Sequence, residues 1–126
     1  MRLRTGMMLA LLVLASTPAA FAQDKHEAEE GEKLFKRVCF TCHTSEAGKN
    51  KIGPSLFGVV GRKAGTEAGF NYSSAMKESN ITWNADSIDQ YLTDPKKFVP
   101  GNKMAYAGVK KAEERKEIIS YLSTLH

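Results

Sequence analysis

The chain contains few of the residues that hold many small proteins together. Two cysteines among 126 residues exclude a disulfide-dense scaffold and a four-thiolate zinc site. No apolar run suits a multi-spanning membrane protein, since the longest, residues 7–15, is about half of the ~20 residues that a spanning helix needs. Charged residues at 25% also argue against such a protein, and the length suits one domain.

The N-terminal segment has the pattern of a secretory signal. Arg2 and Arg4 precede the apolar run, and Ala20-Phe21-Ala22 supplies the small residues that a signal peptidase reads. We expect residues 1–22 to be a cleaved signal peptide and residues 23–126 to form one domain in the periplasm. An uncleaved membrane anchor is the alternative. Loss of the two arginines reduces the net charge from +4 to +2.

Periodicity and capping residues predict an all-α fold. Good helix formers predict a helix over residues 28–38, and an apolar stripe predicts a C-terminal helix over 112–124. A shorter helix is expected over 86–92, with Asn84 or a flanking residue as its cap and Asp94-Pro95 as its stop. No strand-like alternation of useful length is present.

The middle of the chain has too little regular structure to close a core. Six glycines lie within residues 48–69, and this density disfavours continuous helices or strands. A long loop inside a compact domain has to pack on something. We therefore expect a large apolar group at the centre.

Cys39-Phe40-Thr41-Cys42-His43 identifies that group. CxxCH is the covalent attachment signature of a c-type haem. Thiols three residues apart on one helical turn point the same way, so both can add to the vinyl groups on one porphyrin edge. His43 then becomes the proximal iron ligand. The predicted cofactor is one haem c, bound through two thioethers.

Three other interpretations of the two cysteines have less support than haem attachment. A disulfide between Cys39 and Cys42 would leave His43 unexplained. A thioredoxin-like pair needs a βαβ context, which this chain lacks. A zinc site needs two further ligands, and only His26 and His126 remain, both near the ends of the mature chain.

The sixth iron ligand decides between an electron carrier and a haem enzyme. The mature chain has two methionines. Met76 lies in a helical pattern and is interpreted as a packing residue, whereas Met104 lies in a loop without apolar periodicity. Met104 is therefore the predicted ligand, and His26, His126 and Lys103 remain alternatives.

At this point the chain resembles the class I cytochromes c, in particular bacterial cytochrome c2 and mitochondrial cytochrome c. The resemblance covers residues 28–125 and rests on motifs in the family's order. These are Gly31-x-x-x-Phe35, Cys39-x-x-Cys42-His43, Gly53-Pro54, Gly61-Arg62-Lys63, Gly69-Phe70-x-Tyr72, Thr82-Trp83, Tyr91-Leu92-x-x-Pro95, Pro100-Gly101-x-Lys103-Met104 and Ile118-Ile119-x-Tyr121-Leu122. It implies a small all-α cytochrome c fold, with the first and last helices crossing and long loops wrapped around one covalent haem.

The resemblance also implies the residues that line the haem pocket. The Pro54 carbonyl would orient His43, and Tyr91 would lie near the Met104 sulfur. Donors to a buried haem carboxylate would be Arg62, Tyr72 and Trp83. Asn102 would occupy a pocket position where relatives often carry Thr, and Met76 one where they often carry Asn. The hydrogen-bond network of the family is therefore expected to differ here.

Seven lysines match family positions around the exposed haem edge: Lys33, Lys51, Lys96, Lys97, Lys103, Lys110 and Lys111. Such a ring would steer the protein onto acidic redox partners. A bc1-type complex, a terminal oxidase, a photosynthetic reaction centre or a periplasmic dehydrogenase would all fit. Nucleic-acid binding is disfavoured, because no basic run with interleaved aromatic residues is present.

The expected function is a soluble, monomeric periplasmic electron carrier of a respiratory or photosynthetic chain, not an enzyme. It would contact membranes only through its partners. The alternative is a haem enzyme or sensor with an open sixth position, which would bind peroxide or a gas.

Overall fold

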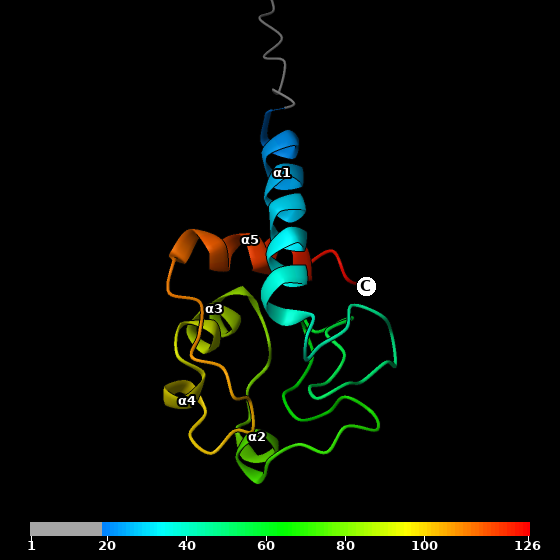
Figure 1. Ribbon diagram of the computed structural model, residues 1–126, viewed down its shortest axis with the longest axis vertical. Helices are drawn as coiled ribbons and strands as arrows, with labels where there is room; N and C mark the ends of the chain where they lie inside the picture. Colours follow the sequence, from blue (N-terminus) through cyan, green and yellow to red (C-terminus); the bar gives the residue numbers. More distant parts are fainter. Residues whose placement is uncertain (1–18) are drawn as a thin grey trace, which may run out of the picture.

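The computed structural model describes residues 19–126, and Figure 1 shows their arrangement. The elements are α1 (Ala19–Leu34), a π-helical turn (Phe35–Cys39), α2 (Ser74–Glu78), α3 (Ala85–Thr93), α4 (Pro95–Phe98) and α5 (Ala112–Leu122). Over this part of the chain the pairing of extended segments is limited to one isolated bridge, between Lys63 and Thr82. The all-α prediction is confirmed.

Most of the predicted signal peptide, residues 1–18, lies outside the described residues. Its last four residues, 19–22, form the start of α1. No helix within residues 19–126 is long and apolar enough to cross a membrane. The cleavage site before Gln23 stays a prediction.

The first helix is longer than its apolar pattern indicated. It begins at Ala19 rather than at Ala28, because the preceding residues are mostly Ala, Gln, Lys and Glu, which favour helix without needing an apolar face. After Leu34 the helix changes to a π-helical turn, closed by the bond from the Phe40 N–H to the Phe35 carbonyl at 2.9 Å. Turns of this kind are rare and often lie at functional sites. Here it ends at Cys39, the first residue of the cysteine motif.

The capping prediction for α3 is confirmed. The Asn84 side chain accepts a hydrogen bond from the Ser87 N–H at 2.9 Å, and the Ser87 hydroxyl accepts one from the Asn84 N–H at 2.9 Å. Asp94 ends α3 and also caps α4, where Pro95 takes the first position. A proline at that position loses no intrahelical hydrogen bond. The chain therefore turns at Asp94 and resumes as a short helix.

Helices α1 and α5 cross near the lower half of α1 (Figure 1), as the resemblance implied. Gly31 makes the close approach possible, since a Cβ atom there would lie 1.8 Å from the Glu117 carbonyl oxygen. The Phe35 and Tyr121 rings pack at 5.3 Å, and both Phe35 and Ile118 are only 1% exposed. This crossing forms one end of the core.

The long loops and α3 complete the core. Buried apolar residues from these segments include Val59, Trp83, Ile88, Val99 and Val109. Helix α3 is held to α5 by an ion pair between Asp89 and Arg115, with 2.7 Å between Oδ1 and Nε. Main-chain hydrogen bonds join the loops to this part of the fold, from the Gly58 N–H to the Leu125 carbonyl after α5 and from the Val109 N–H to the Leu92 carbonyl of α3, both at 2.7 Å.

Candidate haem site

The CxxCH segment forms one tight turn after the π-helical residues. The N–H groups of Cys42 and His43 both donate to the Cys39 carbonyl, at 3.1 and 2.9 Å. Both cysteines are free. Burial, with the neighbouring Cys42 as a smaller cause, raises the pKa of the Cys39 thiol to about 11. A thiol that stays protonated at neutral pH is a poor nucleophile, which disfavours thioredoxin-like chemistry.

The His43 ring is held in one tautomer. Its Nδ1 atom lies 2.7 Å from the Pro54 carbonyl oxygen, and because a carbonyl can only accept, Nδ1 carries the proton. Nε2 is then left with a lone pair. The pKa of His43 is lowered mainly by burial; the Pro54 hydrogen bond opposes this, and the charges of Arg62 and Lys51 add to it. The side chain is thus a neutral imidazole, the form that binds iron.

Gly53 lies against the same ring. A Cβ atom at position 53 would lie 2.4 Å from His43 Cε1 and 2.7 Å from Nδ1. Real side-chain atoms do not approach so closely, so this position needs a residue without Cβ. The Gly53-Pro54 pair therefore holds the ring by contact and by hydrogen bond.

The Met104 loop is organised by Asn102. Its Nδ2 donates to the carbonyls of Pro95 and Val99, both at 2.8 Å, and its Oδ1 accepts from the Met104 N–H at 2.8 Å. Asn102 therefore ties the loop to α4 and its end. These bonds give Asn102 a defined structural role. The sequence had assigned it to the pocket only by resemblance to the family.

Tyr91, on α3, reaches the sulfur of Met104. Its hydroxyl lies 3.8 Å from Sδ and 3.4 Å from the Asn102 Oδ1 atom. Burial raises the pKa of Tyr91 to about 12, so it remains a donor at neutral pH. Its ring packs against Trp83 at 5.0 Å. The predicted neighbourhood of Tyr91 and Met104 is present.

The alternative ligands have other surroundings. Met76 is buried on α2 at 8% exposure and joins the core, as expected of a packing residue. His26 and His126 are exposed, and Lys103 donates to the Asn71 carbonyl at 3.2 Å. Among these candidates, Met104 is the one whose donor atom contacts the hydroxyl of a partly buried tyrosine.

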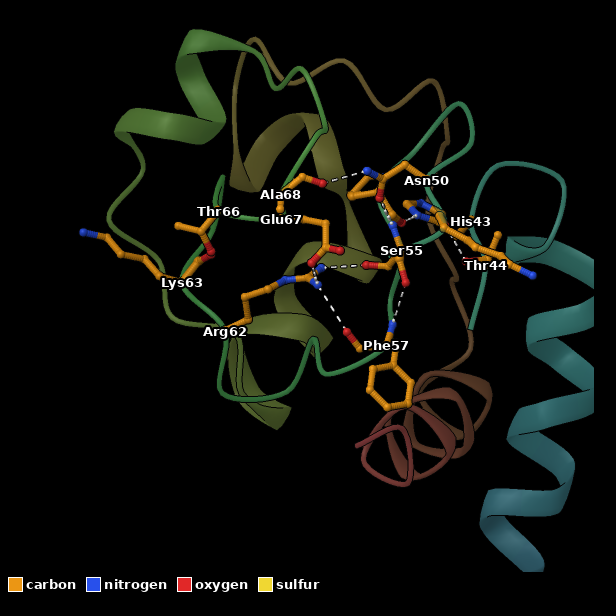
Figure 2. A network of polar contacts seen from close by, with 12 residues as sticks. His43, Thr44, Asn50, Ser55, Phe57, Arg62, Lys63, Thr66, Glu67 and Ala68 are labelled. Atoms are coloured by element: carbon orange, nitrogen blue, oxygen red, sulfur yellow. Dashed lines mark hydrogen bonds and ion pairs between the residues drawn. The ribbon is translucent and has the colours of Figure 1, made fainter. Parts of the chain in front are cut away.

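Arg62 lies at the centre of a second polar network (Figure 2). Its guanidinium pairs with Glu67 at 2.7 Å and donates to the carbonyls of Ser55 and Phe57 at 2.9 and 3.3 Å. The Tyr72 hydroxyl accepts from the Glu67 N–H at 3.2 Å. The main chain of Trp83 pairs with that of Arg62. The structure therefore brings together the three residues predicted to hold a haem carboxylate.

Two members of this network were missed by the sequence reading. Glu67 pairs with Arg62, and Asn50 accepts from the Ser55 N–H and donates to the Ala68 carbonyl, both at 2.9 Å. In sequence each is an ordinary polar residue of a glycine-rich loop. The residues around Glu67 in the sequence do not show whether its carboxylate has a mostly buried partner or lies in water.

The residues present fit a haem. Two free thiols lie on one turn, a neutral imidazole keeps a free nitrogen, and a thioether is fixed beside a tyrosine. A zinc site finds no such support, since residues 19–126 hold no group of three or more His, Cys, Asp or Glu side chains placed to bind a metal. Thiols, an imidazole and a thioether are groups that hold haem in proteins.

The seven predicted docking lysines are all exposed. Lys51 also lies over the ring of Phe40, with its ammonium 4.3 Å from the ring centroid. Phe40 lies within the CxxCH motif and is half exposed. A cation and an apolar ring are therefore presented together beside the cysteines.

Comparison with known proteins gives the same assignment. The family model described as cytochrome c matches residues 28–126. Cytochrome c2 of Rhodopila globiformis is 50% identical over 96 residues, covering 76% of this chain and 91% of that protein. Cytochrome c of Chlamydomonas reinhardtii is 53% identical over 93 residues, covering 73% and 83%.

A solved structure agrees with these relatives. Cytochrome cH from Methylobacterium extorquens superimposes with a TM-score of 0.72 at 45% identity, covering 77% of this chain and 97% of that one. The fold, the cysteine motif and the sequence matches lead to one conclusion. The chain belongs to the cytochrome c family, whose members carry electrons on one covalently bound haem c.

Proposed function

We propose that this chain is a mono-haem electron carrier in which His43 and Met104 ligate the iron, and Cys39 and Cys42 form the two thioethers. The observation that carries the proposal is the hydrogen bond between His43 Nδ1 and the Pro54 carbonyl at 2.7 Å. It leaves Nε2 as the free donor and holds the ring at the cysteine turn. A partner on the outer nitrogen of this kind orients the ligand and raises its basicity.

Met104 supports electron transfer rather than catalysis. The Asn102 and Tyr91 contacts hold its main chain and sulfur, so the thioether can close the sixth position. A haem supplies the one-electron Fe(III)/Fe(II) couple, and a Met/His pair raises its potential. With both axial positions taken by the protein, peroxide or gas chemistry has no open site.

Replacement of Met104 tests the proposal. The oxidised wild-type protein is expected to show a sulfur-to-iron charge-transfer band at neutral pH. Met104→Ala should abolish this band, whereas Met76→Leu, at the second methionine of the described chain, should retain it. A wild-type protein without the band, and with the same spectrum as Met104→Ala, would instead indicate the haem enzyme or sensor.

We also infer a periplasmic location and acidic redox partners. The support is the signal-like pattern of residues 1–22 and the exposed lysines. A bc1-type complex, a terminal oxidase, a reaction centre or a periplasmic dehydrogenase fits this chemistry, with the chain acting as a monomer. Intact mass of the protein purified from whole cells should correspond to a chain that begins at Gln23 and carries one haem. A mass that includes residues 1–22 would indicate the uncleaved anchor.

A further inference from the structure

We propose that Glu67 is a positioning residue that sets the reduction potential of the haem site through Arg62. The inference rests on the proposed function, because it places the iron next to His43. Glu67 has no counterpart among the residues that the sequence assigned to the pocket. Its role is to hold the Arg62 guanidinium and to offset its charge.

The Arg62–Glu67 pair differs from the other ion pairs of the described chain because both of its side chains are mostly buried. Its side chains are 13% and 16% exposed, and the 2.7 Å contact joins Nη1 to Oε2. The pair of Lys49 and Glu46, by contrast, is 65% and 61% exposed. Charges in a partly dry region interact more strongly than charges in water, so removal of one partner has a larger effect here.

A continuous set of contacts joins the pair to His43. The second guanidinium nitrogen, Nη2, donates to the Ser55 carbonyl at 2.9 Å, and Ser55 follows directly after Pro54, whose carbonyl holds the His43 ring. Figure 2 shows Ser55 between the Arg62–Glu67 pair and His43. Glu67 thus acts on the segment that orients the proximal ligand.

The charge of Arg62 also reaches His43. Burial is the main cause of the lowered His43 pKa, and the Arg62 charge acts in the same direction. A positive charge near an iron site favours the state with one more electron, so Arg62 alone would raise the potential. The Glu67 carboxylate cancels part of that charge. The balance between the two side chains therefore fixes how much positive charge the site experiences.

The arrangement also restricts the guanidinium. Three of its five N–H groups have acceptors within the protein: Glu67, Ser55 and Phe57. The Glu67 N–H is itself bonded to Tyr72 at 3.2 Å, which fixes the main chain that carries the carboxylate. These three acceptors limit how the guanidinium can turn, and Glu67 is the charged one among them.

The test is the reduction potential of the haem-loaded protein. Glu67→Gln keeps the shape and one acceptor but removes the charge. Its reduction equilibrium constant should rise by about threefold or more, an upward shift of ~28 mV at ~59 mV per tenfold change. Glu67→Asp, which keeps the charge, should return the potential toward wild type. Glu46→Gln is the matched control at an exposed pair, and it should leave the potential unchanged.

A double variant separates charge balance from general disturbance. Arg62→Gln should lower the potential, and Arg62→Gln with Glu67→Gln should lie closer to wild type than either single variant. If Glu67→Gln misfolds, recovery of the folded haem spectrum in the double variant supports the proposal, and its absence contradicts it.

Failure of this inference is distinguishable from failure of the proposed function. A charge-transfer band in every variant, with the Glu67→Gln potential equal to that of Glu46→Gln, would overturn the role of Glu67 alone. A wild-type protein without the band would overturn the His43/Met104 ligation, and with it this inference.

Discussion

The Nδ1 atom of His43 lies 2.7 Å from the carbonyl oxygen of Pro54, and Gly53 lies against the same ring. This relationship joins the cysteine turn to the glycine-rich loop. It orients the imidazole, fixes its tautomer and leaves one nitrogen free for iron. A loop that contains neither helix nor strand therefore determines which nitrogen of His43 is free to bind iron.

Gly53→Ala should disturb this contact. The new Cβ would lie 2.4 Å from His43 Cε1, so the ring or the loop has to move. We expect a loss of about 1–3 kcal/mol in the free energy of unfolding, as for other overpacked sites, together with a changed haem absorption spectrum. Urea unfolding followed by absorbance measures both. An unchanged spectrum and urea midpoint would show that the ring is not held by this contact.

Replacement of both cysteines should release the haem from the chain. In wild type, thioether bonds at Cys39 and Cys42 should keep the pigment on the protein in acidified organic solvent. In the Cys39→Ala, Cys42→Ala variant the haem should be extracted, because only ligation remains. Retention of pigment by the variant after extraction would contradict covalent attachment at these residues.

Gly31→Ala should separate the crossing helices. The nearest atoms to the new methyl group are the Glu117 carbonyl oxygen at 1.8 Å and carbon at 2.5 Å, and main-chain atoms cannot move aside without shifting α5. We expect a loss of about 3 kcal/mol or more in the free energy of unfolding, at the upper end for overpacking.

The control for this variant is Gly48→Ala. A Cβ at position 48 would meet no atom within 4 Å, although its φ of +71° is unfavourable for alanine. Urea midpoints of the two variants therefore separate contact from backbone strain. Equal losses would contradict the close approach of α1 and α5.

Acid should weaken the same helix pair through Glu27. Its hydrogen bond to Lys116, at 2.6 Å, is the largest cause of a lowered Glu27 pKa. A carboxyl with a lowered pKa in the folded state stabilises the fold above its unfolded value of 4.5 and loses that contribution as pH falls below it. Glu27→Gln should remove this part of the pH dependence of stability below pH 4.5. Urea midpoints at a series of pH values measure it. Glu29→Gln, whose partner Lys25 lies 3.9 Å away, is the control. Parallel pH curves for wild type and Glu27→Gln would rule out this contribution.

Salt should slow electron transfer to an acidic partner. The exposed lysines attract such a partner over a distance that ionic strength shortens, to about 8 Å at 0.15 M. We expect the second-order rate constant to fall as salt rises, and Lys96→Gln with Lys97→Gln to reduce its dependence on salt. Stopped-flow mixing with an acidic redox protein measures this. A rate that does not change with salt would remove the case for steering by lysines.

Local chemistry made several features predictable from sequence. The CxxCH spacing identifies a haem because two thiols and an imidazole on one turn have few other uses. Asn84 and Pro95 marked the ends of helices because capping depends on neighbouring residues. The stripe in residues 112–124 gave α5, since one face has to pack.

Two other features were not predicted correctly from the sequence. Sequence placed the first helix at residues 28–38, but helix propensity extends it to Ala19 and the π-helical turn ends it at Cys39. The Arg62–Glu67 pair looked like two ordinary loop charges, and its burial exists only once the loops are packed.

By itself, the sequence determined the cofactor chemistry, the approximate positions of α1, α3 and α5, and the family. Local spacing and periodicity set the first two, and the order of motifs along the chain identifies the family. The family resemblance implied that Pro54 and Tyr91 would contact His43 and Met104, but only the tertiary structure supplied the geometry of these contacts and the Glu67–Arg62 pair. Pro54 against His43, Tyr91 against Met104 and Glu67 against Arg62 are contacts between segments, or across a folded loop. Their geometry arises from packing, which no local pattern encodes.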